Sequence, residues 1–185
     1  MKQDETKEKL IECTVELLLK SENPGKITAR DITKASGVNL AMINYYFKSK
    51  EELLKRAVDL IIAQDFEKIL HGDFSGLSDR QILHDILKQI IAVVYKYSSL
   101  SRLTIPYILL KDQITVPLKF YPYIRKCMKE RNDSQCKIIA YQIISFLQLI
   151  FLREDEFFRF TGVNIGNVEE RESFIKFQID LFLGE

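Results

Sequence analysis

The hydrophobic residues of this chain recur every three or four positions along most of its length, which is the spacing of one face of an α-helix. In the first such segment, Leu10, Leu17 and Leu18 share one stripe and predict a helix over residues 4–20. The Asn-Pro-Gly triplet at 23–25 ends that segment. Alternation with a period of two nowhere extends beyond a few residues, so the pattern predicts an all-α fold.

A short second helix is predicted over residues 28–35. Thr28 is a suitable N-cap, and Asp31, three residues later, complements the positive end of the helix dipole. Ile32 and Ala35 are expected on the inner face of this helix.

Further caps and turn residues divide the rest of the chain. Gly37 suits the left-handed turn that ends the second helix, and Asn39 is the expected N-cap of a third helix over 39–46. Ser49 and Glu52 have the spacing of a capping box at the start of a longer helix. The remaining predicted helices span residues 50–70, 79–98, 101–113, 117–131, 134–153 and 168–183.

The second and third helices, joined by a short turn that contains glycine, form a helix-turn-helix pattern. Successive side chains of a helix point about 100° apart. If Ile43 faces the core, Leu40 and Phe47 lie on the same side and are expected to pack on the first helix. Tyr46 then lies on a flank, and Tyr45 points away from the core.

The outward face of the third helix carries residue types that read DNA. Ala41 permits close approach and contact with a thymine methyl, Asn44 can pair with adenine, and the Tyr45 hydroxyl can donate to a phosphate. Lys50 can neutralise a phosphate, and Arg30 can reach a base edge or a phosphate.

Charge is distributed unevenly along the chain, although the net charge is only +1. Residues 26–56 contain seven Lys or Arg and three acidic residues, a local excess of +4. Such a basic patch favours binding to a phosphate backbone. The alternative interpretation, that residues 36–50 form an ordinary helical hairpin with a solvated polar face, stays open on these observations.

The stretch TARDITKASGVNLAMINYYFKSKEELL, residues 28–54, resembles the DNA-binding signature of the TetR family of transcriptional regulators. The chain departs from the family pattern at Thr33, at Ser36 after Ala35, at Asn39 and at Asn44. Asn39 still serves as a cap, whereas Asn44 removes a hydroxyl that the family commonly has there. The positions that match are Thr28, Asp31, Ile32, Gly37, Val38, Ile43, Tyr46, Phe47, Lys50 and Leu54.

The resemblance covers about the first 55 residues and implies roles for individual side chains. It implies a helix-turn-helix DNA-binding domain over residues 1–55 and a larger helical domain for effector binding and dimerisation over 56–185. The residues it implies as phosphate ligands are Thr28, Tyr46 and Lys50. Those it implies to lie nearest the bases are Arg30, Leu40, Ala41, Asn44 and Tyr45.

Two helices near the C-terminus, 134–153 and 168–183, have apolar faces broader than one packing contact requires. Such faces suit a four-helix bundle formed across a two-fold axis, and TetR-like proteins dimerise in this way. We therefore expect a homodimer through these helices. The alternative is that both helices fill the core of a monomer.

The segment 104–124 contains three prolines and four aromatic residues, a composition that favours irregular packing around an apolar ligand. A small-molecule effector of unknown identity is therefore a candidate partner, and ordinary core packing with surface tyrosines is the alternative. The candidate ligand-binding residues are Tyr95, Tyr107, Phe120, Tyr123 and Phe146.

The sequence does not have the residue pattern of an enzyme. His71 and His84 flank a turn and are expected at the surface, and the acidic run within 153–160 is expected to be a solvated helix end. Gly-rich phosphate loops and metal-ligand spacings are absent from the sequence. We therefore expect no catalytic residues, no metal and no cofactor.

Cysteine usage and hydropathy indicate the compartment. The three cysteines are widely spaced and no secretory signal is apparent, so reduced thiols in a cytoplasmic protein are expected. The most apolar stretch, 138–152, is short and is interrupted by three polar residues, so we expect no association with a membrane.

Taken together, these features predict a ligand-responsive transcriptional regulator that acts as a repressor. It is expected to bind a palindromic double-stranded DNA operator as a homodimer. The alternative is a DNA-binding protein without a small-molecule switch, either architectural or regulated by a protein partner.

Overall fold

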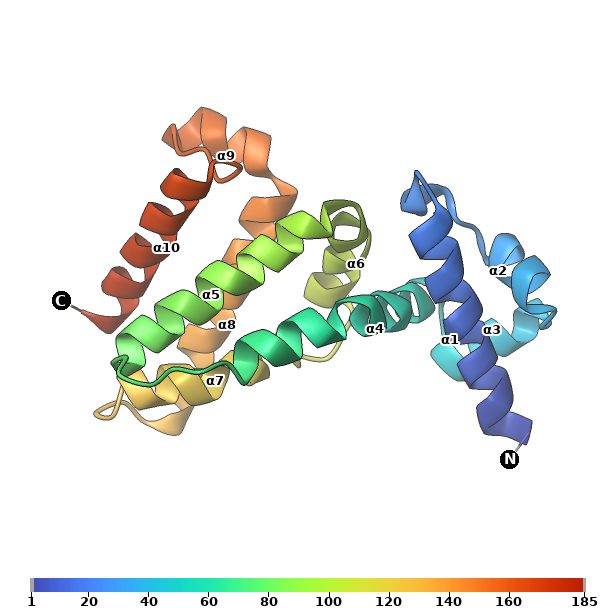
Figure 1. Ribbon diagram of the computed structural model, residues 1–185, viewed down its shortest axis with the longest axis horizontal. Helices are drawn as coiled ribbons and strands as arrows, with labels where there is room; N and C mark the ends of the chain where they lie inside the picture. Colours follow the sequence, from blue (N-terminus) through green and yellow to red (C-terminus); the bar gives the residue numbers. More distant parts are fainter. Residues whose placement is uncertain (1, 185) are drawn as a thin grey trace. The chain divides into compact units, whose positions relative to one another are not determined.

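The computed structural model describes the backbone of residues 2–184 and the side chains of residues 5–184. Within that range every regular element is a helix and no strand occurs, which confirms the predicted all-α fold (Figure 1). The helices are α1 (Lys2–Lys20), the 3₁₀ turn η1 (Pro24–Lys26), α2 (Ala29–Ser36), α3 (Leu40–Phe47), α4 (Lys50–Leu70), α5 (Asp79–Lys96), α6 (Ser98–Leu110), α7 (Val116–Cys127), α8 (Asp133–Leu152), α9 (Glu154–Thr161) and α10 (Val168–Leu183).

One helix, α9, is absent from the sequence prediction, which extends the preceding helix to a solvated end over 153–160. The Arg153 amide instead donates to the carbonyls of both Leu149 and Ile150, at 3.1 and 3.0 Å, which tightens the last turn of α8 and ends it. The acidic residues then occupy the first turn of a new helix, where their charge is favourable. Most side chains of α9 are solvent-exposed.

The chain divides into two compact units. The first comprises residues 1–68 and 93–110, and the second comprises residues 69–92 and 111–185. Helices α4 and α5 each contribute to both units, so the chain crosses between the units within helices as well as at the end of α6.

The first unit is built around the inner faces of α1, α2, α3 and α4. Leu10, Ile32, Ile43 and Phe47 are completely or almost completely buried and form one cluster with the first turns of α4. Leu100 of α6 belongs to the same cluster, and α6 also lies against η1. A segment distant in sequence therefore completes the core of the helix-turn-helix region.

Two predictions about inward-facing residues are wrong. Ser36, not Ala35, is buried, because it lies about 40° from Ile32 around the helix whereas Ala35 lies about 60° away on the other side. Leu40 is 46% exposed. Leu40 is the first residue of α3. Because the side chains of a helix lean towards its N-terminus, Leu40 extends past the start of the helix instead of packing on α1.

The second unit contains the first part of α5 with α7, α8, α9 and α10. Helices α7 and α8 pack on each other through buried residues that include Phe120, Ile124 and Cys136. Ion pairs link α5 to α10, with Lys88 2.8 Å from Glu172. The rings of Phe146, Phe157 and Phe174, from α8, α9 and α10, meet at centroid distances of 5.5–6.4 Å.

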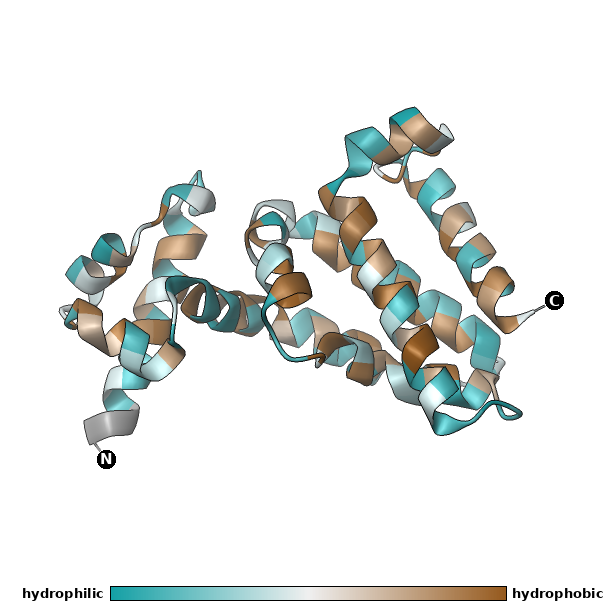
Figure 2. Cartoon of the chain, turned by 180° about the vertical axis from the view of Figure 1, so that it is seen from behind, coloured by the Kyte–Doolittle hydropathy of each residue, from teal (hydrophilic) through white to brown (hydrophobic). Residues whose placement is uncertain are grey.

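Helix α8 is apolar along most of its length, as the brown ribbon of Figure 2 shows. By length and composition alone it would suit a membrane span, a test that core helices of water-soluble proteins also pass. Seven of its residues are buried in the protein. Packing within the chain therefore accounts for one part of its apolar character, while Ile138, Tyr141 and Leu149 remain exposed.

We expect Phe47→Ala to destabilise the protein by about 3–5 kcal/mol, because a fully buried ring is replaced by a cavity. Chemical denaturation followed by circular dichroism measures this change. Tyr45→Ala is the matched control, since that ring is two residues away and 64% exposed, and its effect is expected to be several-fold smaller. Equal losses for both variants would contradict the orientation of α3.

Candidate nucleic-acid interface

The N-terminus of α2 is closed by a reciprocal capping box. The Asp31 amide donates to the Thr28 hydroxyl oxygen at 3.2 Å, and the Asp31 carboxylate accepts from both the amide and the hydroxyl of Thr28 at 2.8 and 2.7 Å. These hydrogen bonds, the side-chain one foremost, lower the pKa of Asp31. Because the Thr28 hydroxyl is already engaged, a phosphate contact through this hydroxyl requires it to exchange its bond to Asp31.

The turn between α2 and α3 has the geometry that its residues predict. Gly37 adopts φ 66°, a left-handed conformation in which a side chain would be strained, and its amide closes the end of α2 on the carbonyl of Thr33. The Asn39 side chain then accepts from the Ala41 amide at 2.9 Å, so the predicted cap of α3 is confirmed.

The two faces of α3 differ sharply in burial. Ile43 and Phe47 are 1% and 0% exposed, whereas Tyr45 is 64% exposed. Ala41 and Asn44 are also exposed, so the predicted division of this helix into a core face and an outward face is confirmed. Leu40 joins the outward face.

The aromatic residues at the end of α3 form a continuous series of edge contacts. The rings of Tyr45 and Tyr46 lie 5.0 Å apart at 80°, and those of Tyr46 and Phe47 lie 6.3 Å apart at 62°. Tyr46 is half-buried and connects the exposed ring of Tyr45 to the buried ring of Phe47. The orientation of Tyr45 is therefore supported by packing that reaches the core.

Lys50 joins the start of α4 to the segment before α2. Its ammonium donates to the Ile27 carbonyl at 3.2 Å, a contact across 23 residues of sequence. An ammonium has three donors, so this bond leaves capacity for a phosphate beside the capped end of α2. Arg30, in the first turn of α2, is exposed on the same unit.

The predicted capping box of α4 forms on one side only. The Glu52 amide donates to the Ser49 hydroxyl at 3.1 Å, but the Ser49 amide donates to the Phe47 carbonyl at 2.6 Å. The Glu52 carboxylate instead accepts from the Tyr107 hydroxyl at 3.4 Å. A residue of α6 is thus connected to the first turn of the helix that follows α3.

One residue of this region is not identified by the sequence analysis. Lys48 has φ 60° and is the only residue other than glycine with a positive φ in the part of the chain that the structure describes. It ends α3, and its amide donates to the Asn44 carbonyl. Its position between two predicted helices, one residue before a helix-capping serine, is the signal that would have identified it.

The candidate ligand residues are distributed over both units. Tyr95 and Tyr107 belong to the first unit, and Phe120, Tyr123 and Phe146 to the second. Phe120 is fully buried, and the Tyr123 hydroxyl donates to the Leu70 carbonyl at 2.7 Å. Phe146 packs in the aromatic cluster of α8, α9 and α10 and is 39% exposed.

The cysteines and acidic residues do not point to a metal site. No group of three or more His, Cys, Asp or Glu suited to a metal ion is found among the residues that the structure describes. Burial, foremost, and the nearby Asp79 raise the pKa of Cys127 to about 11, so this thiol is protonated at neutral pH.

Comparison with known proteins agrees with the geometry of this surface. The sequence model of the family described as "Bacterial regulatory proteins, tetR family" matches residues 17–57, a range that contains α2, α3 and the start of α4. Residues 17–57 are therefore similar to the N-terminal segment of TetR-family regulators. All eight residues predicted to contact DNA lie within the matched range.

A curated relative extends the similarity beyond the TetR-family N-terminal segment. The chain is 25% identical over 150 residues to "Probable HTH-type transcriptional regulator YttP" of Bacillus subtilis (strain 168). That alignment covers 77% of this chain and 72% of the relative. No solved structure matches the chain significantly.

We expect the contribution of Asp31 to stability to depend on pH. Its folded-state pKa lies below the ordinary value of 3.8, so the stabilisation is present above that value and is lost as pH falls through the folded-state pKa. Asp31→Asn should therefore lower the thermal unfolding midpoint at pH 7, and the difference from the unmodified protein should shrink towards pH 3.

Thermal melts at pH 7, 4 and 3 measure this dependence. Thr28→Ser, which keeps the hydroxyl, is the control and should behave as the unmodified protein does. A deficit of Asp31→Asn that is the same at all three pH values would contradict the role of the carboxylate.

Proposed function

We propose that this protein is a TetR-family regulator, a cytoplasmic, ligand-responsive repressor that binds a palindromic DNA operator as a homodimer. The observation that carries the DNA-binding part is the division of α3. Ile43 and Phe47 are buried in the core, while Ala41, Asn44 and Tyr45 are exposed to solvent.

In the proposed complex, α3 lies in the major groove with its exposed residues at the base edges. Asn44 and Tyr45 form hydrogen bonds with base edges, and Leu40 and Ala41 provide apolar contact with thymine methyl groups. Arg30 reaches the same groove from α2. The phosphates on either side are bound by Lys50, by the Tyr46 hydroxyl and at the start of α2 by Thr28.

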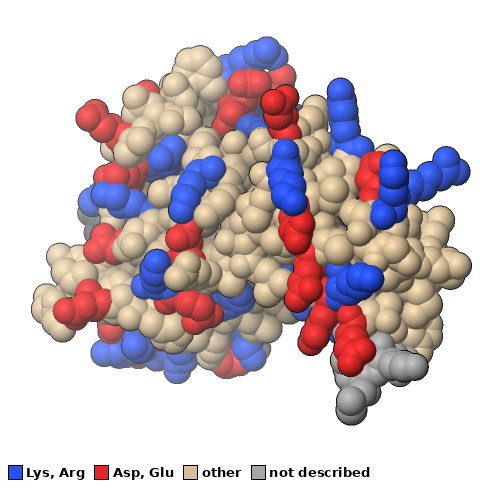
Figure 3. All heavy atoms as spheres, turned by 45° about the vertical axis from the view of Figure 1, so that its right-hand side comes forward, with Lys and Arg blue, Asp and Glu red and all other residues tan. Residues whose placement is uncertain are grey.

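The charge of the helix-turn-helix segment supports its binding to DNA. Figure 3 shows acidic and basic side chains interspersed over the visible face, in keeping with the net charge of +1. The excess of +4 over residues 26–56 is therefore a local property of the segment that contains α2 and α3. Association should consequently weaken steeply with salt.

Exposed apolar residues on α8 and α10 support the homodimer. On α8, Ile138, Tyr141 and Leu149 follow one helical stripe, and on α10 Phe177 and Leu181 are one turn apart. Phe177 and Leu181 are 58% and 63% exposed within one chain. Burial of such residues against their counterparts in a second copy is worth about 1.5–3 kcal/mol for each side chain.

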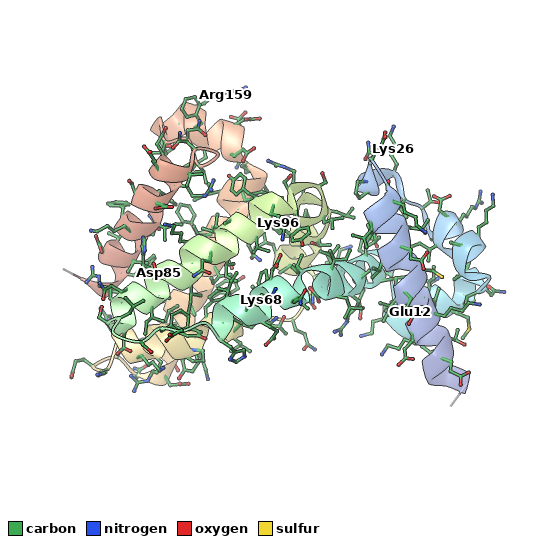
Figure 4. All side chains as sticks on the ribbon, in the orientation of Figure 1. Glu12, Lys26, Lys68, Asp85, Lys96 and Arg159 are labelled. Atoms are coloured by element: carbon green, nitrogen blue, oxygen red, sulfur yellow. The ribbon has the colours of Figure 1, made fainter. Side chains whose placement is uncertain are left out.

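Continuity of the chain supports a switch between the two units. Helices α4 and α5 contribute to both units, and α6 packs on the core of the helix-turn-helix region through Leu100. Within the first unit, the ammonium of Lys96, labelled in Figure 4, lies 2.7 Å from the carboxylate of Asp65 and joins the end of α5 to α4. An effector that binds better to one arrangement of these helices would shift the protein towards that arrangement. The resulting change in DNA affinity is set by the difference between the effector's affinities for the two arrangements.

Selection of bound fragments from a random-sequence duplex library tests the DNA-binding proposal. We expect a palindrome with half-sites about one helical turn apart, because two recognition helices related by a two-fold axis enter successive major grooves. Tyr45→Ala should change which sequences are recovered. Lys50→Ala should weaken binding to all duplexes and reduce the salt slope by about 0.9, the amount expected for one lost phosphate contact.

Unchanged affinity and salt slope in Lys50→Ala would show that the proposed docking is wrong. Recovery of a single, non-repeated half-site would contradict the dimeric complex.

Ligand responsiveness requires a separate experiment. Candidate apolar and aromatic compounds are added to the protein bound to a labelled, selected duplex, and release is followed by fluorescence anisotropy. Release by one compound class supports the switch, whereas retention of DNA with every compound tested favours regulation by a protein partner.

Phe177→Glu is expected to convert the dimer to a monomer, because two charges would have to be buried across the two-fold axis. Sedimentation velocity measures the mass, and circular dichroism shows that the helices remain. Leu118→Glu is the matched control, since Leu118 is 52% exposed on α7 of the same unit and should leave the dimer intact. A dimer that persists in Phe177→Glu would place the interface elsewhere.

A further inference from the structure

Lys48 occupies a backbone conformation that its side chain disfavours. Its φ of 60° and ψ of −31° combine a positive φ, which glycine adopts readily and a residue with a Cβ does not, with a ψ outside the left-handed helical region. Strain of this kind persists where the surrounding structure imposes it and is concentrated at functional sites. Glycine or asparagine would fill this turn at a lower cost in stability.

The turn itself is fixed by hydrogen bonds on both sides. The Lys48 amide donates to the Asn44 carbonyl at 3.0 Å, and the next amide, that of Ser49, donates to the Phe47 carbonyl at 2.6 Å. Phe47 is fully buried on one side, and Ser49 caps α4 on the other. The position of the Lys48 backbone is therefore determined by the core and by the cap.

The side chain of Lys48 has no internal role that accounts for its presence. It is exposed, and its ammonium forms no hydrogen bond or ion pair with the residues that the structure describes. In sequence it lies three residues after the exposed Tyr45 and two residues before Lys50. A lysine at this turn is thus placed at the border of the outward face of α3.

We propose that the Lys48 ammonium is a phosphate ligand of the DNA complex, which the positive-φ turn between α3 and α4 presents to the backbone beside the Lys50 contact. The inference rests on the proposed function, because it requires α3 to dock in the major groove. It adds one ionic contact, and such contacts act on duplexes of any sequence.

Three substitutions of Lys48 separate its charge from its backbone conformation. Lys48→Gly and Lys48→Asn remove the charge and suit a positive φ, whereas Lys48→Arg keeps the charge and the strain. Lys68→Gln is the control for net charge. Lys68 lies eighteen residues beyond Lys50 on α4, about 27 Å by helical rise, which is well beyond the screening length at 0.15 M salt.

The measurement is fluorescence anisotropy with a labelled 30-base-pair duplex of random sequence, at several salt concentrations, together with thermal melts of each variant. We expect Lys48→Gly and Lys48→Asn to bind about tenfold more weakly, with the salt slope reduced by about 0.9, while their unfolding midpoints equal or exceed that of the unmodified protein. Lys48→Arg and Lys68→Gln should keep both the affinity and the slope.

Unchanged affinity and slope in Lys48→Gly and Lys48→Asn, with the unmodified protein binding the duplex, would overturn the inference and leave the proposed function intact. A loss of affinity without a change in slope would also overturn it, since the contact would not be ionic. Failure of the unmodified protein to bind any duplex would overturn the proposed function and, with it, the role of Lys48.

Discussion

The burial of Ile43 and Phe47 is the constraint on which the candidate interface depends. Helix α3 has only eight residues, too few for a stable helix in isolation, so its position is set by the side chains that it inserts into the core. Once those two residues are buried, the 100° advance per residue leaves Ala41, Asn44 and Tyr45 facing solvent. The outward face is a geometric consequence of the inward one.

The ends of the short helices are fixed by local hydrogen bonds that supplement this packing. The Thr28–Asp31 box, the Asn39 cap and the Lys50–Ile27 bond satisfy polar groups at the starts of α2, α3 and α4 or just before them. These hydrogen bonds restrict the backbone that carries the exposed side chains of α3. Such preorganisation lowers the conformational entropy that is lost when DNA binds.

In the second unit, α8 and α10 have more apolar surface than the rest of one chain covers. Buried residues such as Ile143 and Ile175 hold these helices within the unit, while Ile138 and Phe177 remain exposed. The aromatic contacts of Phe146, Phe157 and Phe174 bring α9 into the same assembly. This surplus of apolar surface is the feature that a second copy would cover.

Local physics made much of this protein predictable from its sequence. Helical periodicity gave the all-α fold, and the glycine at 37 and the caps at 28 and 39 placed the turns to within a residue or two, because these signals act through neighbouring backbone groups. The inward direction of Phe47 and the outward direction of Tyr45 followed from helix geometry alone. The TetR-like signature lies in these same residues, and the family model matches the segment 17–57 that contains them.

Tertiary structure decided what depends on distant neighbours. The packing of α6 on the helix-turn-helix core and the Tyr107–Glu52 bond each join residues whose proximity no local pattern encodes. The exposure of Leu40 and the positive φ of Lys48 were likewise decided by where helices begin and end against the core. Hydrogen-bond caps act over three or four residues, so a local sequence pattern identifies them. Packing acts between any two surfaces that the fold brings together, and local patterns do not identify which distant residues will meet.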